Sequence, residues 1–129
     1  SYRVWSLRAY ARVVALPGDR PPQKTFEMLD DAMKLASRPE DKELILSRLA
    51  AVRVPDALAR LLGYVDDAAL RGAAVPAVFE VAKGLSQSHP EQARAALEKI
   101  APLATDPALL QQIPKVLRDI ESRKKGEKP

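Results

Sequence analysis

Cysteine is absent from the 129-residue sequence, and histidine and tryptophan occur once each. Without cysteine the chain has neither a disulfide framework nor a thiol nucleophile, and one histidine leaves no set of ligands with the spacing of a zinc site. Long apolar segments are also missing. The longest uncharged run, residues 72–79, is eight residues, whereas a membrane-spanning helix needs about 20.

The start of the chain lacks a charged segment followed by an apolar core, so we expect no secretory signal. Its first residue is Ser1 and not Met, and we expect the sequence to be a piece of a longer protein. The hydrophobic fraction of 47% and the charged fraction of 29% are those of an ordinary globular chain, which excludes a disordered or collagen-like protein.

Alanine and leucine dominate the sequence, and β-branched residues are few. This composition favours an all-α fold. The 11 prolines do not oppose it, because several stand where an apolar helical period begins, at Pro39, Pro55, Pro90 and Pro107. Proline is favoured at the first position of a helix, where its missing N–H has no partner to lose.

The 3.6-residue period predicts seven helices, at about residues 2–16, 24–37, 39–52, 55–65 and 67–87 and from residues 90 and 107 onward. Pro76 and Pro114 lie inside the fifth and seventh, which we expect to be kinked but continuous. The fifth is apolar around most of its circumference and should lie between neighbours. We expect the core to include Leu61, Val78, Phe79, Leu97 and Leu117, and the seventh helix to bury Leu110, Ile113 and Ile120 beside Leu117.

Helix pairs starting near residues 24, 55 and 90 form a weak internal repeat with spacings of 31 and 35 residues. The clearest copy reads Pro55-x-Ala57-Leu58, then Asp67 at the turn between helices, then Leu70-Arg71. With these residues the chain resembles the HEAT-repeat family. The resemblance implies an all-α superhelix of about three helix pairs plus one extra helix over residues 1–123, followed by a charged disordered tail at 124–129.

In that family the turn aspartate and the arginine commonly form a ladder between repeats. The resemblance therefore implies that Asp67 caps the fifth helix and that Arg71 bonds a neighbouring turn or carboxylate. The next pair has Asp106 but carries Leu110 where the arginine belongs, so a long ladder is not expected. The resemblance extends to HEAT-like segments of large bacterial multidomain proteins, which implies an extracytoplasmic setting.

Candidates for catalysis are few. His89 precedes a proline where a helix begins, and we interpret it as a structural residue of the loop. Asp30 and Asp31 are adjacent and point about 100° apart on a helix, so they do not form an acid–base dyad. Asp66 and Asp67 lie at a turn, where aspartate caps helices. We expect no catalytic residue, no metal and no cofactor.

Charge is distributed unevenly: residues 1–25 carry a net charge of +4, residues 26–114 carry −3 and residues 115–129 carry +3. We interpret the chain as a non-enzymatic module for protein–protein interaction, or a structural spacer, whose partner is another protein or an adjacent domain of the parent chain. Its contacts would lie on the second helices of the pairs, at Arg48, Lys83, Lys115 and Arg118. A nucleic-acid-binding HEAT-like module with basic terminal regions stays open as the alternative, although few aromatic residues are available for base stacking.

Trp5 lies on a second apolar flank of the first predicted helix, away from the face that should contact the rest of the chain. An apolar strip of this kind marks an interface. We expect an earlier helix of the parent protein or a second copy of the chain to cover it, so self-association through the Trp5 face is a further prediction.

Overall fold

The computed structural model describes the backbone of residues 21–126 and the side chains as far as residue 123. The helix predicted at residues 2–16, with Trp5, lies outside this part of the chain. Residues 21–126 fold into six α-helices and one short 3₁₀ helix without a strand, as the all-α prediction requires. They are α2 (Pro22–Leu35), α3 (Pro39–Leu49), α4 (Pro55–Tyr64), α5 (Arg71–Leu85), α6 (Pro90–Ile100), η1 (Ala101–Leu103) and α7 (Pro107–Gly126).

Prolines begin all of these α-helices except α5. The residue before the first proline of α3 and of α4 is extended, because the proline ring disfavours the α conformation of its predecessor. Inside the helices, Pro76 and Pro114 leave α5 and α7 continuous, as predicted. Proline thus sets where the helices begin without dividing them.

Two helix boundaries differ from the prediction. α5 begins at Arg71 and not near residue 67, because the preceding residues form a separate turn in which Leu70 N–H bonds the Asp67 carbonyl. α7 continues to Gly126 and therefore includes residues 124–126, which were expected to belong to the disordered tail.

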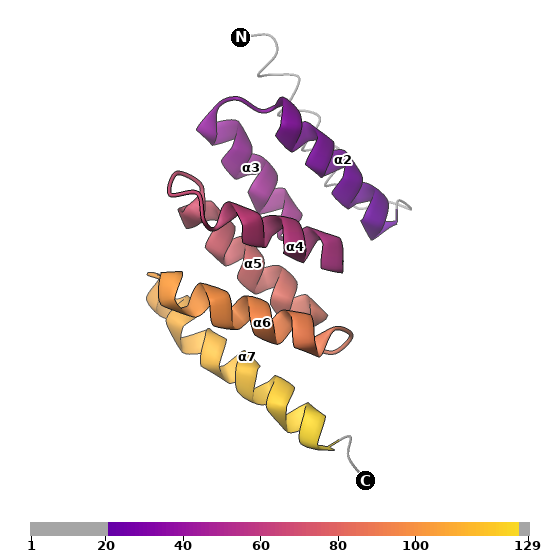
Figure 1. Cartoon of the computed structure of the whole chain (residues 1–129), viewed down its shortest axis with the longest axis vertical. Helices are drawn as coiled ribbons and strands as arrows, with labels where there is room; N and C mark the ends of the chain where they lie inside the picture. Colours follow the sequence, from indigo (N-terminus) through magenta and orange to yellow (C-terminus); the bar gives the residue numbers. More distant parts are fainter. Residues whose placement is uncertain (1–20, 127–129) are drawn as a thin grey trace.

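The helices lie in two rows that follow the long axis of the molecule (Figure 1). In the first row α4 contacts both α2 and α6, and in the second row α5 contacts both α3 and α7. Helices that are consecutive in sequence, such as α4 and α5, cross between the rows and pack against each other. The second row therefore brings the second helix of each predicted pair side by side.

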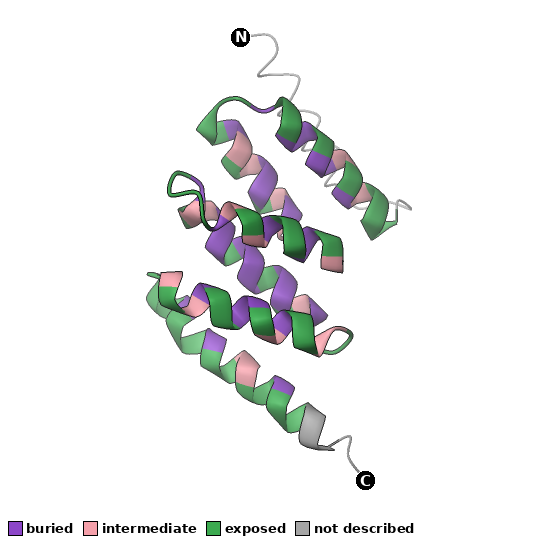
Figure 2. Cartoon of the chain, viewed as in Figure 1, coloured by how far each residue is buried: buried purple, intermediate pink, exposed green. Residues whose placement is uncertain are grey.

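The core is centred on α5, which is buried along most of its length (Figure 2). α5 lies between neighbours on several sides, because it packs against α3, α4, α6 and α7. Leu61, Val78, Phe79 and Leu97 are buried as predicted. Leu117 is only partly buried, since α7 packs against α5 and α6 along one side and leaves the rest of its surface to solvent.

The prediction of a buried side chain is wrong at one position of α7. Leu110 is 46% exposed, and Leu109 is buried in its place. The helical period alone allowed either leucine to face inward. The turn before α7 selects Leu109, because it repeats the turn before α5, where Leu70 is buried and the following Arg71 is only partly buried.

Candidate functional site

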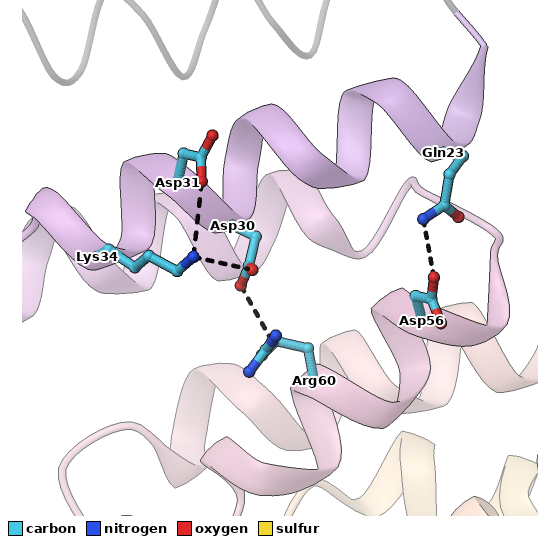
Figure 3. A network of polar contacts seen from close by, with 6 residues as sticks. All are labelled: Gln23, Asp30, Asp31, Lys34, Asp56 and Arg60. Atoms are coloured by element: carbon cyan, nitrogen blue, oxygen red, sulfur yellow. Dashed lines mark hydrogen bonds and ion pairs between the residues drawn. The ribbon is translucent and has the colours of Figure 1, made fainter.

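Several charged side chains of the first row are paired with each other or with neighbouring elements. Arg60 of α4 pairs with Asp30 of α2 at 3.0 Å, as Figure 3 shows. On α6, Lys99 lies 3.4 Å from Asp66, and Arg94 reaches both Glu98 of its own helix and Glu121 of α7. Three of these pairs, Arg60–Asp30, Lys99–Asp66 and Arg94–Glu121, connect different elements of the stack.

Cations of the second row have no such partners. Several arginine and lysine side chains on α3, α5, α7 and the α3–α4 connection form no ion pair with any residue of the described part of the chain, among them Arg48, Arg53, Lys83, Lys115 and Arg118. Arg48 and Lys83 lie in the last turns of α3 and α5, where positive charge is favoured by the helix dipole. Among the residues that the structure describes, the second row thus presents several cations without an ion-pair partner, beside the similarly unpaired carboxylates Glu43, Glu80 and Asp119.

A polar pocket of about 320 Å³ opens among these cations. It is lined by Arg53, Glu80, Lys83, Gly84, Ser86 and Gln87. Five of these residues come from the C-terminal part of α5 and the turn after it, and Arg53 comes from the α3–α4 connection. We call this the Arg53 pocket.

Gly84 determines how closely Arg53 approaches α5. A Cβ atom built on Gly84 would lie 2.5 Å from Cδ and 2.7 Å from Nε of Arg53. The stem of Arg53 therefore rests directly on the backbone of α5, in space that any other residue would fill. Gly84 does not have a positive φ angle, so the backbone conformation does not require glycine there.

Ser86 holds a second arginine beside the pocket. Its buried hydroxyl donates a hydrogen bond to the Lys83 carbonyl at 2.8 Å and accepts one from Nη1 of Arg123 at 3.5 Å. The ammonium group of Lys83 lies 6.0 Å from the centre of the Phe79 ring, within cation–π range. Arg53, Lys83 and Arg123 thus surround one pocket whose lining contains a single carboxylate, that of Glu80.

The four predicted contact residues lie on the three helices of the second row, which pack side by side. Of these residues only Lys83 lines the Arg53 pocket. Lys115 and Arg118 are exposed on α7, where Arg118 Nε donates to the Pro114 carbonyl at 3.5 Å. Arg48 is half-buried on α3, and its Nε atom is buried without a hydrogen-bond partner in the described part of the chain.

Sequence reasoning missed Arg53, Gly84 and Arg123. Gly84 carried a usable signal, because a glycine inside a helix is unfavourable and often marks a close approach of another group. The identity of that group had no signal, since Arg53 is distant from Gly84 in the sequence and meets it only in the packed structure.

The turn before α5 differs in part from the prediction. Asp67 does not cap α5 itself, whose N-cap residue is Leu70. Its carboxylate instead accepts the Ala69 N–H at 2.9 Å within the preceding turn. Arg71 does bond a neighbouring turn, as predicted, because its Nε donates to the Val65 carbonyl at 2.9 Å.

A second cavity, of about 370 Å³, lies where this turn approaches the α6–α7 connection. Most of its lining is apolar and includes Val75, Pro76 and Leu109, with Arg71 and Asp106 as its charged residues. Arg71 and Asp106 are both engaged in holding their own turns. The cavity therefore offers few groups for recognition.

The structure does not bring catalytic groups together within the described residues. His89 is the N-cap residue of α6, and its ring contacts only the neighbouring Ser88 hydroxyl. Asp30 and Asp31 bind cations and do not face each other as a dyad. Over the same part of the chain, no group of three or more histidine and carboxylate residues could hold a metal ion.

No helix within the described range 21–126 has the length and apolar character needed to cross a membrane. Comparison of the chain with protein-family models, with curated proteins and with solved structures finds no match. Any assignment of function therefore depends on the charges and contacts of the residues themselves.

Proposed function

We propose that the chain is a non-enzymatic module of helical repeats that binds an acidic segment of another protein, or of an adjacent domain, on its second row of helices. The observation that carries the proposal is the contrast between the rows. Arg60, Arg94 and Lys99 of the first row have carboxylate partners, whereas Arg48, Lys83 and Lys115 of the second row have none among the described residues.

Charge complementarity gives the proposal its physical basis. A cation that has no carboxylate partner loses little when it contacts an anionic partner, because no internal ion pair must break first. Positive patches that meet negative ones also accelerate encounter and select against basic partners. The three helices of the second row offer such a patch over several turns, which suits an extended acidic segment.

The repeat architecture is supported by two equivalent turns. Asp67 accepts the Ala69 N–H at 2.9 Å before α5, and Asp106 accepts the Ala108 N–H at 3.0 Å before α7. In each turn the aspartate carbonyl also accepts the N–H four residues later. This local identity between two helix pairs favours a HEAT-like repeat, in which stacked pairs expose one continuous row of helices to a partner.

A peptide selection tests the proposal. A random peptide library displayed on phage is selected against the immobilised chain, and enriched peptides are measured by fluorescence anisotropy. The test variant removes the charges at the four predicted contacts: Arg48→Ala, Lys83→Ala, Lys115→Ala and Arg118→Ala. The control variant removes the same charge elsewhere: Lys24→Ala, Lys34→Ala, Arg38→Ala and Lys99→Ala.

We expect the selected peptides to be rich in aspartate and glutamate and to bind the control variant as they bind the original chain. Removing the four contacts should weaken binding by at least about tenfold, or 1.4 kcal/mol. Equal binding to both variants contradicts the proposal. Strong, steeply salt-dependent binding of duplex DNA without selection of acidic peptides supports the nucleic-acid alternative instead.

A further inference from the structure

We infer that the Arg53 pocket is an oxyanion site that receives a carboxylate side chain of the acidic partner, and that Gly84 makes the site by letting Arg53 lie across α5. The inference rests on the proposed function, because it assigns one subsite of the proposed binding surface. It adds two residues that the sequence did not indicate, and it gives the surface a defined point of contact.

The inference begins from the close contact between Gly84 and Arg53. Gly63, Gly72 and Gly84 lie inside α4 and α5, and a Cβ built on Gly63 or Gly72 meets nothing within 4 Å. Only at Gly84 would a Cβ collide with a neighbour, and that neighbour is the stem of Arg53. Because glycine destabilises a helix interior relative to alanine, the close approach of Arg53 is the physical reason for glycine at position 84.

The charged groups around the pocket favour an anion. Arg53 forms no ion pair or hydrogen bond with any residue that the structure describes, so the donors of its guanidinium group remain available. A guanidinium group matches a carboxylate with two parallel hydrogen bonds. Lys83 lines the same pocket, and Arg123 is held beside it by Ser86. The pocket therefore has a net positive charge despite Glu80.

Size and charge indicate the kind of anion. A volume of about 320 Å³ is near the lower end for small-molecule sites and admits one side chain or a small anion. The net positive charge of the pocket attracts an anion, and Glu80 in the lining reduces that charge. A carboxylate on an extended segment also lets the rest of that segment contact Lys115 and Arg118 on α7, which are exposed.

The experiment measures binding of a fluorescein-labelled dodecapeptide of alternating glutamate and glycine by anisotropy. The test variants are Gly84→Ala, Arg53→Ala and the double variant, and Gly63→Ala is the matched control. Each glycine substitution should maintain or raise the melting temperature, because alanine favours the helix and, at Gly84, only the Arg53 side chain must move. A change in affinity then reports on Arg53 and not on the fold.

We expect Gly84→Ala and Arg53→Ala each to weaken peptide binding by about tenfold, the loss of one charge-assisted contact. The double variant should be no weaker than Arg53→Ala alone, because both changes remove the same contact. Gly63→Ala should bind like the original chain. Additive losses in the double variant, or original affinity in Gly84→Ala, overturn the inference.

Other outcomes separate this inference from the proposed function. If removal of the four predicted contacts abolishes binding but Gly84→Ala and Arg53→Ala bind normally, the proposed function stands and the pocket assignment is wrong. If the original chain does not bind the peptide, both fail. If millimolar inorganic phosphate displaces the peptide only when Arg53 is present, while the peptide itself binds the Arg53→Ala variant unchanged, the site is one for phosphate and the inferred carboxylate is wrong.

Discussion

Arg60 of α4 reaches across to α2 and places its Nε atom 3.0 Å from Oδ1 of Asp30. The carboxylate is nearly enclosed, with its side chain 12% exposed, whereas the Arg60 side chain is 50% exposed. Lys34 approaches the other oxygen of Asp30 only to 4.0 Å. Arg60 is therefore the main partner of a carboxylate that water hardly reaches.

Replacing Arg60 with methionine should lower the free energy of unfolding by about 1–2 kcal/mol, because the Asp30 carboxylate loses its main ion-pair partner in a site with little water. Lys34→Met is the control and should change stability by less than about 0.5 kcal/mol, as surface pairs do. Urea unfolding followed by circular dichroism measures both. Equal losses for the two variants contradict the assigned role of Arg60.

Tyr64 should make stability depend on alkaline pH. Burial raises the pKa of its phenol above the ordinary 10.0, and the Asp30 carboxylate raises it further, while Arg60 opposes the change. A pKa that is higher in the folded state stabilises the fold below the unfolded pKa, and this contribution is lost as pH rises through the folded pKa. Above pH 10 the chain should therefore lose stability faster than the Tyr64→Phe variant. Urea unfolding of both proteins at several alkaline pH values measures the difference, and parallel curves contradict the prediction.

Truncation of Phe79 tests the core. Its side chain is 1% exposed in the middle of α5, and Phe79→Ala should lower the free energy of unfolding by about 3–5 kcal/mol, as large core truncations do. Leu35 is 59% exposed, so Leu35→Ala should cost less than about 0.5 kcal/mol. Thermal or urea unfolding of the two variants measures both losses in stability. A small loss at Phe79 means that α5 is not the central helix.

The two aspartate turns should contribute similarly to stability. Asp67→Ala and Asp106→Ala each remove a side-chain acceptor from a backbone N–H, and each should cost about 1 kcal/mol at neutral pH. Asp66→Ala is the control, because Asp66 is exposed and binds only the Lys99 ammonium group. Its effect should stay below about 0.5 kcal/mol. The equivalence of the two turns is contradicted if Asp67 matters and Asp106 does not.

Most helix boundaries could be predicted because proline marks them locally. Pro39, Pro55, Pro90 and Pro107 each begin a helix where the sequence predicted it. α5 has no such proline, and its start was placed too early because Asp67 can open either a helix or an isolated turn. The difference depends on how Arg71 bonds back to α4, and the helical period contains no information about that contact.

The candidate site was predicted less well than the fold. The row of helices that carries Arg48 and Lys83 followed from the pairing of helices, which is a local property of the chain. The pocket did not follow, because Arg53 and Gly84 meet only through the packing of the α3–α4 connection on α5. The prediction that Leu110 is buried was wrong for a similar reason. The helical period of α7 allows either Leu109 or Leu110 to face the core, and the preceding turn selects Leu109.

The central position of α5 has a consequence for how the chain unfolds. A linear array of repeats loses its terminal units one at a time, because each unit contacts only its neighbours. Here α5 packs against α3 and α4 on one side of the stack and against α6 and α7 on the other, so opening it disconnects both halves at once. Amide hydrogen exchange should therefore be slowest in α5 and should report there the global free energy, while α2 and the end of α7 exchange by local opening.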